Sequence, residues 1–189
     1  MSYLVAISQV SLADQQKQRT KAVIAGKQAL IDASVVKNFD ASIDRDPDYR
    51  IDFVPAGTRA GLTGWLSMPF AAAATVYSLL ADNVPAALTP QVPNNAVWVF
   101  YGVHILTLND PATQLYFGVG NNNIRKANFD LEKLYDQQET NGYFTNPVVY
   151  GPQDIVNITL LSRIALGAAV GCRCVLDSVI VEPNTVSQV

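Results

Sequence analysis

Cysteine and histidine are scarce in this 189-residue sequence, which contains only Cys172, Cys174 and His104 of these types. In a strand the two cysteines would lie ~7 Å apart, too far for a disulfide bond, and with Leu176 they would share the face opposite Arg173 and Asp177. A structural zinc site needs four ligands, and His104 is the only other good one. We therefore expect the cysteines to pack in the core, with no metal bound.

Charge is also low, because charged residues make up 15% of the chain and the net charge is −3. The basic residues are scattered, so no attraction to nucleic acid or to an anionic membrane is expected. The longest apolar stretch, residues 68–81, is shorter than the ~20 residues that span a bilayer, and the N-terminal sequence lacks the features of a signal peptide. We expect a soluble protein that is not exported by a signal peptide.

Catalytic motifs are missing as well. His104 has no serine or cysteine motif around it and is expected to be a packing residue within a strand. Residues 44–48 resemble the start of a calcium loop but lack the glycine and glutamate that follow in an EF-hand, so only a weaker calcium site, completed by other loops, stays open. No phosphate-binding glycine loop is present. The chain is therefore expected to be neither an enzyme nor a cofactor-binding protein.

An acidic cluster is the remaining candidate for hydrolytic chemistry. Two carboxylates that flank a cleft can hydrolyse a glycosidic bond, but the spacing of these residues marks no cleft. Beside Lys133 they read as a solvated face, and a hydrolase here is the weakest of the functional hypotheses. The cluster consists of Asp130, Glu132, Asp136 and Glu139.

A long helix is expected near the N-terminus, over residues 11–37. Ser11 suits the N-cap and Asp14 suits the first turn, where a negative charge favours the helix dipole. The apolar stripe is thin, so the helix either lies across its own domain or forms an arm that packs on a neighbouring subunit. We divide the chain into a helical arm, residues 1–40, and a β-sandwich domain, residues 41–189.

After residue 38 the pattern becomes that of short strands separated by proline and glycine. Residues 96–108 and 113–119 flank a turn sequence at 109–112 and are expected to form a hairpin. Residues 71–80 suit either a strand or a helix. With few helices and no β-α-β alternation, the expected fold is mainly β, an antiparallel β-sandwich of the jelly-roll form. The other expected strands are 49–54, 62–67, 124–131, 147–150, 155–163 and 171–181.

Residues 95–183 resemble a known protein family. The segments that carry the resemblance are VWVFYGVHILTL, LYFGVG, FDLEKLY, GYFTNPVVYGPQDIVNITLLSR and the closing GCRCVLDSVIVEP. Together they look like the jelly-roll cement or decoration proteins of tailed bacteriophage capsids.

The resemblance implies a non-catalytic structural protein of the virion. Such proteins sit on the outer surface of the phage head as homo-oligomers, often trimers, and clamp adjacent subunits of the major capsid protein. The implied location is the capsid surface, after assembly in the host cytoplasm, with neither nucleic acid nor a membrane as a partner.

Four aromatic residues are the candidates for contacts with such partners, because aromatic side chains concentrate at interface hot spots. Trp98 is expected in the core instead. The alternative function is a carbohydrate-binding β-sandwich module of a phage or bacterial surface protein, in which tyrosine and phenylalanine side chains near Asn and Asp groups would stack on sugars. The four interface candidates are Trp65, Tyr135, Tyr143 and Phe144.

Overall fold

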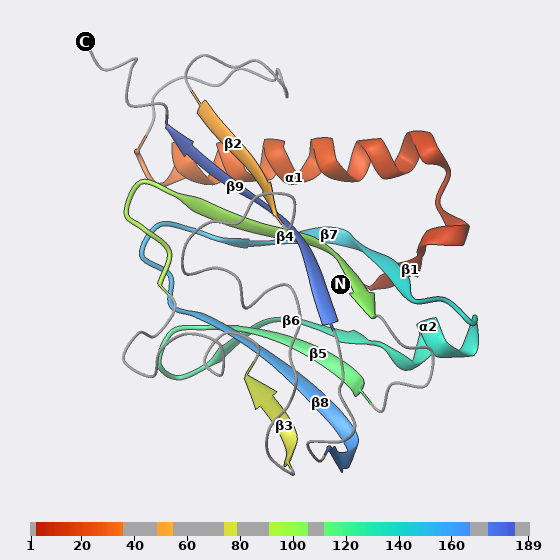
Figure 1. Ribbon diagram of the computed structural model, residues 1–189. Coiled ribbons are helices and arrows are strands. Elements are labelled where there is room, and N and C mark those ends of the chain that lie inside the picture. Colours follow the sequence, from red (N-terminus) through yellow and green to blue (C-terminus); the bar gives the residue numbers. More distant parts are fainter. Residues whose placement is uncertain are drawn as a thin grey trace.

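The computed structural model describes residues 3–35, 49–54, 74–78, 91–105, 112–166 and 174–183. Two antiparallel sheets face each other, and the long helix α1 lies on the outer face of one of them (Figure 1). This arrangement confirms the expected mainly β fold and the antiparallel β-sandwich. The structure therefore places one hydrophobic core between the sheets and another beneath the helix.

Nine strands make up the two sheets within the described residues. The five-stranded sheet has the order β1 (Leu4–Ala6), β7 (Asn141–Tyr150), β4 (Val97–Ile105), β9 (Cys174–Pro183) and β2 (Tyr49–Val54). The four-stranded sheet has the order β3 (Ala74–Ser78), β8 (Val156–Leu166), β5 (Ala112–Val119) and β6 (Ile124–Asp130). The helices are η1 (Ile7–Gln9), α1 (Leu12–Asp32) and α2 (Glu132–Asp136).

The strand pairs are nested along the chain. The last strand, β9, pairs with β2, β8 pairs with β3, β7 pairs with β4, and β6 pairs with β5. Of these pairs only β5 and β6 form a local hairpin, which turns at Gly120–Asn123. Most of the sheet therefore depends on contacts between segments that are far apart in sequence.

The expected hairpin of residues 96–108 and 113–119 is wrong, because these segments lie in different sheets. Strand β4 pairs with β7 and β9, whereas β5 pairs with β6 and β8. A turn sequence between two strands indicates that the chain changes direction, but it does not require the flanking strands to pair with each other. Residues 74–78 form a strand and not the alternative helix, and the strand expected at 62–67 lies outside the described residues.

The core between the sheets is built around aromatic rings. The ring of Phe117 lies 5.6 Å from Phe100, 5.8 Å from Phe129 and 5.6 Å from Phe144, measured between centroids. Phe129 of β6 stacks on Phe144 of β7 with 3.9 Å between their ring centroids, so the cluster joins the two sheets. Trp98 is also buried in this core, which confirms its expected position.

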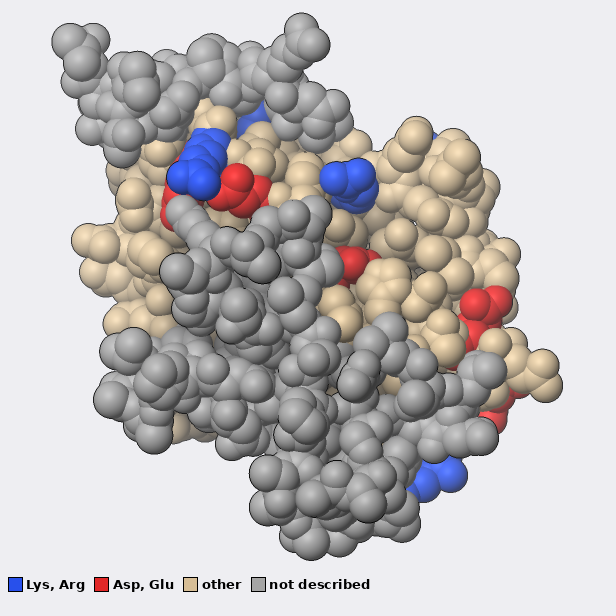
Figure 2. Space-filling view, viewed as in Figure 1, with Lys and Arg blue, Asp and Glu red and all other residues tan. Residues whose placement is uncertain are grey.

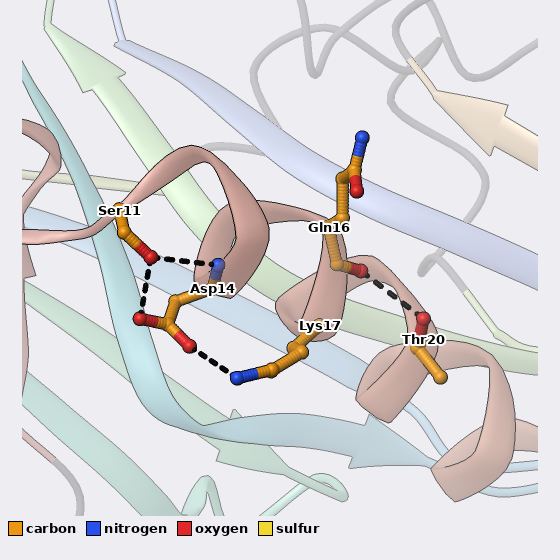
Figure 3. A network of polar contacts seen from close by, with 5 residues as sticks. All are labelled: Ser11, Asp14, Gln16, Lys17 and Thr20. Atoms are coloured by element: carbon orange, nitrogen blue, oxygen red, sulfur yellow. Dashed lines mark hydrogen bonds and ion pairs between the residues drawn. The ribbon is translucent and has the colours of Figure 1, made fainter.

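Helix α1 begins where the sequence indicates. The Ser11 hydroxyl accepts a hydrogen bond from the backbone N–H of Asp14, at 3.2 Å, and donates one to the Asp14 carboxylate, at 2.7 Å (Figure 3). Lys17 donates to the same carboxylate at 2.8 Å, so the first turn is held by a connected set of polar contacts. The predicted N-cap is confirmed, although the helix ends at Asp32 and not at residue 37.

Small residues allow α1 to approach the five-stranded sheet closely. The buried face of α1 packs against the outer face of the sheet, and its small residues are Ala22 and Gly26. Val23 and Leu30 lie on the same buried face. Strand β4 is consequently covered on both faces, by the other sheet and by α1, and almost all its residues are buried. Within this chain, therefore, α1 packs on its own sandwich, and β1 adds residues 4–6 to the same sheet.

Candidate functional site

The outer face of the five-stranded sheet is interrupted by a β-bulge in β4. The register of β4 shifts between Phe100 and Gly102 against both neighbouring strands. Against β9 the extra residue is Tyr101, whereas against β7 the extra residues belong to β7, between Tyr143 and Val148. Before the bulge Val99 faces α1, and after it Val103 faces the core between the sheets. A bulge of this kind redirects side chains and often lies beside a functional site.

Beyond the bulge, His104 of β4 contacts Asp177 of β9. The distance from His104 Nε2 to Asp177 Oδ2 is 2.6 Å, and their side chains are 29% and 14% exposed. The hydrogen bond to Asp177 raises the pKa of His104 even though partial burial opposes protonation, and a hydrogen bond to Asn141 of β7 contributes in the same direction. Contact with the Asp177 carboxylate therefore favours the protonated form of His104.

Two tyrosines and a glycine complete the surroundings of this pair. Tyr101 and Tyr143 are stacked, with 6.3 Å between ring centroids and 12° between ring planes. Burial raises the pKa of both hydroxyls, and the nearby charge of Asp177 adds to this effect. A β-carbon on Gly102 would lie 2.8 Å from Asp177 Oδ2, so the carboxylate can take this position only because residue 102 has no side chain.

We call these residues the His104–Asp177 cluster: Tyr101, His104, Asn141, Tyr143 and Asp177. Arg19 of α1 closes one side, where it hydrogen-bonds Tyr101, and its guanidinium lies 4.0 Å from the centroid of the Phe53 ring. The cluster offers an imidazole, a carboxylate, an amide and an aromatic surface, and Arg19 adds a cation beside it. This arrangement suits the binding of a polar group, because several hydrogen-bonding side chains lie beside an aromatic surface.

The Asp177→Asn substitution is expected to lower the free energy of unfolding in a pH-dependent way. The folded-state pKa of His104 is raised, so its stabilising effect is fully present below the unfolded value of about 6.5 and is lost as the pH rises through the folded value. We expect a loss of about 1–2 kcal/mol near pH 6 and a smaller loss near pH 9. Urea unfolding of the wild-type and variant proteins at each of these two pH values measures the difference between the two losses.

The matched control for this substitution is Asp136→Asn, which changes an exposed carboxylate of α2. It should have a small effect that does not vary over the same pH range. A loss for Asp177→Asn that stays constant with pH would contradict the assignment of a raised pKa to His104.

The aromatic residues predicted as interface candidates lie in different environments in the structure. Tyr143 belongs to the His104–Asp177 cluster, whereas its neighbour Phe144 is fully buried in the core and offers no surface to a partner. Tyr135, on α2, is partly buried against the same core. Trp65 lies outside the described residues. Alternation along a strand places Tyr143 and Phe144 on opposite faces, and this is the signal in the sequence that distinguishes them.

The side chains of the two cysteines lie outside the described residues, but the alternation expected for their strand can be followed in β9. Leu176 faces the core and Asp177 the outer face, as the expected alternation requires. The backbone of Cys174 pairs with Ile105 at the start of β9, but its side chain and all of Cys172 lie outside the described residues, as does the 44–48 loop.

The acidic residues around α2 have local structural roles. Asp130 Oδ1 accepts a hydrogen bond from the backbone N–H of Glu132 at 3.0 Å, and Glu132 in turn binds Arg163 of β8. Among the described residues, no group of three or more histidine, cysteine or acidic side chains is placed to hold a metal ion. Asp130 and Glu132 thus help to fix α2 to the sandwich.

Surface charge, membrane-spanning segments and comparisons with known proteins give no further indication of a functional site. On the face shown in Figure 2, basic and acidic side chains of the described residues lie interspersed and not in one large patch. No described helix is both long and apolar enough to cross a membrane. Neither known protein-family models nor curated protein sequences contain a match to this chain.

Proposed function

We propose that the chain is a non-catalytic cement protein of a virus particle, a jelly roll that binds the outer surface of a phage head and stabilises contacts between major capsid subunits. The nested pairing of β2 with β9, β3 with β8, β4 with β7 and β5 with β6 carries this proposal. Jelly rolls have eight strands paired in this way and are frequent in viral capsid proteins and lectins. The sequence resemblance of residues 95–183 favours the first of these two classes.

The composition of the His104–Asp177 cluster supports a non-catalytic role. A histidine–carboxylate pair becomes a catalytic device when it activates a nucleophile. The groups that surround this pair in the described structure are Asn141, Arg19, Gly102 and two tyrosines, and the pKa of both tyrosine hydroxyls is raised further above its ordinary value, which disfavours the nucleophilic phenolate. The pair is better suited to holding β4 and β9 together at the bulge.

Exposed apolar side chains near the N-terminus support a role in assembly. Tyr3 is 59% exposed and Leu12 is 73% exposed, although both belong to segments that are otherwise anchored to the five-stranded sheet. Side chains of this kind are available for contacts with other subunits, and a closed oligomer would bury them. We expect these contacts in a homotrimer and with the capsid.

The proposed function predicts a trimer that binds particles. Sedimentation equilibrium of the purified chain is expected to give three times its mass of 20.5 kDa. Mass spectrometry should detect the chain in purified particles, and particles that lack it should release their genome at a lower temperature until the protein is added back. A chain that stays monomeric at every concentration and never binds particles would overturn the proposal.

Carbohydrate binding is the second candidate function, and the surroundings of Tyr143 favour it. Its half-buried ring lies on the same outer face as Asn141 and Asp177, so an aromatic surface sits beside an amide and a carboxylate. Binding to a glycan array that is lost in Tyr143→Ala but kept in Tyr3→Ala would support it. An array without any bound glycan would exclude it in favour of the particle role.

A further inference from the structure

A groove opens along one side of the sandwich, between the edges of the two sheets. Its volume is about 380 Å³, and it is lined by β1, by β6 and by Lys133 of α2. We call this feature the edge groove. Tyr3 and Leu4 line it from the five-stranded sheet, and residues 125–130 line it from the four-stranded sheet.

Strand β6 provides hydrogen-bonding groups along this groove. It is the outermost strand of its sheet and, among the described strands, pairs only with β5. Among the described residues its second edge therefore has no strand partner over 7 residues, which include a β-bulge at Lys126 but no proline. On the opposite side β1 has only 3 residues, so it covers only the part of β7 around Phe144.

Lys126 spans the opening beyond the end of β1. Its ammonium group donates a hydrogen bond to the carbonyl oxygen of Val149 in β7 at 2.8 Å, and it lies 3.4 Å from Asp154 Oδ2. One cation of the groove is thus already used to connect the two sheets. The cations on either side of it are in a different situation.

Arg125 and Lys133 are exposed and form no ion pair with any described residue. Within the described part of the chain, neither side chain has a hydrogen-bond or ion-pair partner. Asp130 is the acidic residue of the lining, and its carboxylate accepts the backbone N–H of Glu132. The edge groove is therefore locally positive, although the whole chain has a net charge of −3.

We propose that the edge groove binds an extended, acidic segment of a partner protein, which adds to β6 as a further strand. The backbone of the segment would pair with the free edge of β6, its carboxylates would approach Arg125 and Lys133, and an apolar side chain would pack on Tyr3. Strand addition of this kind takes its affinity from backbone hydrogen bonds and its specificity from alternate side chains. Charge complementarity then selects an acidic segment.

A second copy of this chain does not supply such a segment from its described edge strands. In β2, Arg50 pairs with Asp52 at 3.0 Å, so this strand has no acidic excess on the paired face. Strands β1 and β3, with the sequences LVA and ATVYS, have no charged residues, and β6 itself, IRKANFD, has two basic residues and one acidic residue. The positive groove thus points to another protein.

The proposed function implies that the partner is a capsid subunit, and this identification rests on that proposal. The test therefore uses the full-length chain and a defined peptide, which do not depend on the identity of the partner. The probe is a fluorescent heptapeptide of alternating glutamate and valine, and its control has lysine in place of glutamate. We expect the acidic peptide to bind at least about tenfold more tightly in fluorescence anisotropy, and its affinity to fall as salt is raised. Binding by this peptide reports on the groove whether or not the chain binds particles.

Two variants and a modified peptide locate the binding. Arg125→Glu combined with Lys133→Glu should weaken binding about tenfold or more, whereas Lys21→Glu, an exposed lysine of α1, should leave it unchanged. A probe methylated on alternate backbone nitrogens should also bind more weakly, because it cannot complete a strand pair. Circular dichroism confirms that each variant is folded.

Several results would overturn the proposal. Equal binding of the acidic and basic peptides, equal loss in Lys21→Glu, or undetectable binding of the acidic peptide would each exclude an acidic strand in the edge groove. A self-association that excludes the peptide, and is abolished by Arg125→Glu with Lys133→Glu, would instead assign the groove to a second copy of the chain.

Discussion

Replacing Phe117 with alanine is expected to lower the free energy of unfolding by about 3–5 kcal/mol, more than we expect for a substitution at any exposed position of the sandwich. The ring is fully buried in β5 and contacts Phe100, Phe129 and Phe144, which belong to both sheets. Its removal would leave a cavity where the sheets face each other, and the surrounding rings could fill that space only partly.

Urea unfolding followed by tryptophan fluorescence measures this loss. The matched control is Ile124→Ala in the adjacent strand β6, where the side chain is 64% exposed and its removal should cost less than about 0.5 kcal/mol. Similar losses for Phe117→Ala and Ile124→Ala would show that the aromatic cluster does not join the sheets as the structure indicates.

The Gly26→Leu substitution in α1 is expected to lower the free energy of unfolding by about 3 kcal/mol. A β-carbon at this position would lie 2.6 Å from Val181 Cγ2 and 3.3 Å from Val99 Cγ2, so any side chain would push the helix away from the sheet. Leucine favours helix more than glycine does, and the loss would therefore come from packing and not from helix propensity.

Two comparisons isolate this packing effect. Gln16→Leu, on the exposed face of the same helix, should change the free energy of unfolding by less than about 0.5 kcal/mol. Gly26→Ala combined with Val181→Ala should cost less than the sum of the two single changes, because the second creates space for the first. Strict additivity would contradict the close contact between α1 and β9.

Much of the local structure could be predicted from the sequence. Ser11 marks the start of α1 because its hydroxyl side chain can cap the first turn, and strand β2 has the bounds that its residue pattern indicates. The continuous apolar run of residues 97–103 contained further information, since a strand covered on one face only would alternate. That run reflects the burial of β4 beneath both the other sheet and α1.

The pairing of strands could not be predicted in the same way. Strands β4 and β5 follow each other in sequence and are separated by turn residues, yet each pairs with strands from distant parts of the chain. Pairing depends on which faces bury together in three dimensions, and no short segment contains that information.

The candidate site was beyond sequence reasoning for the same reason. His104 and Asp177 are 73 residues apart, and the bulge at Tyr101 that positions them is a property of three paired strands. Tyr143 was identified as a candidate by its residue type alone. Its association with Asn141 and Asp177 became evident only with the sheet assembled.

The central place of β9, between β4 and β2, has a consequence for how the protein is made. The five-stranded sheet has no continuous middle until residues 174–183 have been synthesised, and these follow all the other described strands in the sequence. Until then β2 and β4 lack their shared neighbour and expose edges that can pair with other nascent chains. Such a topology has high contact order, so we expect folding to be slow and to complete only after β9 has left the ribosome.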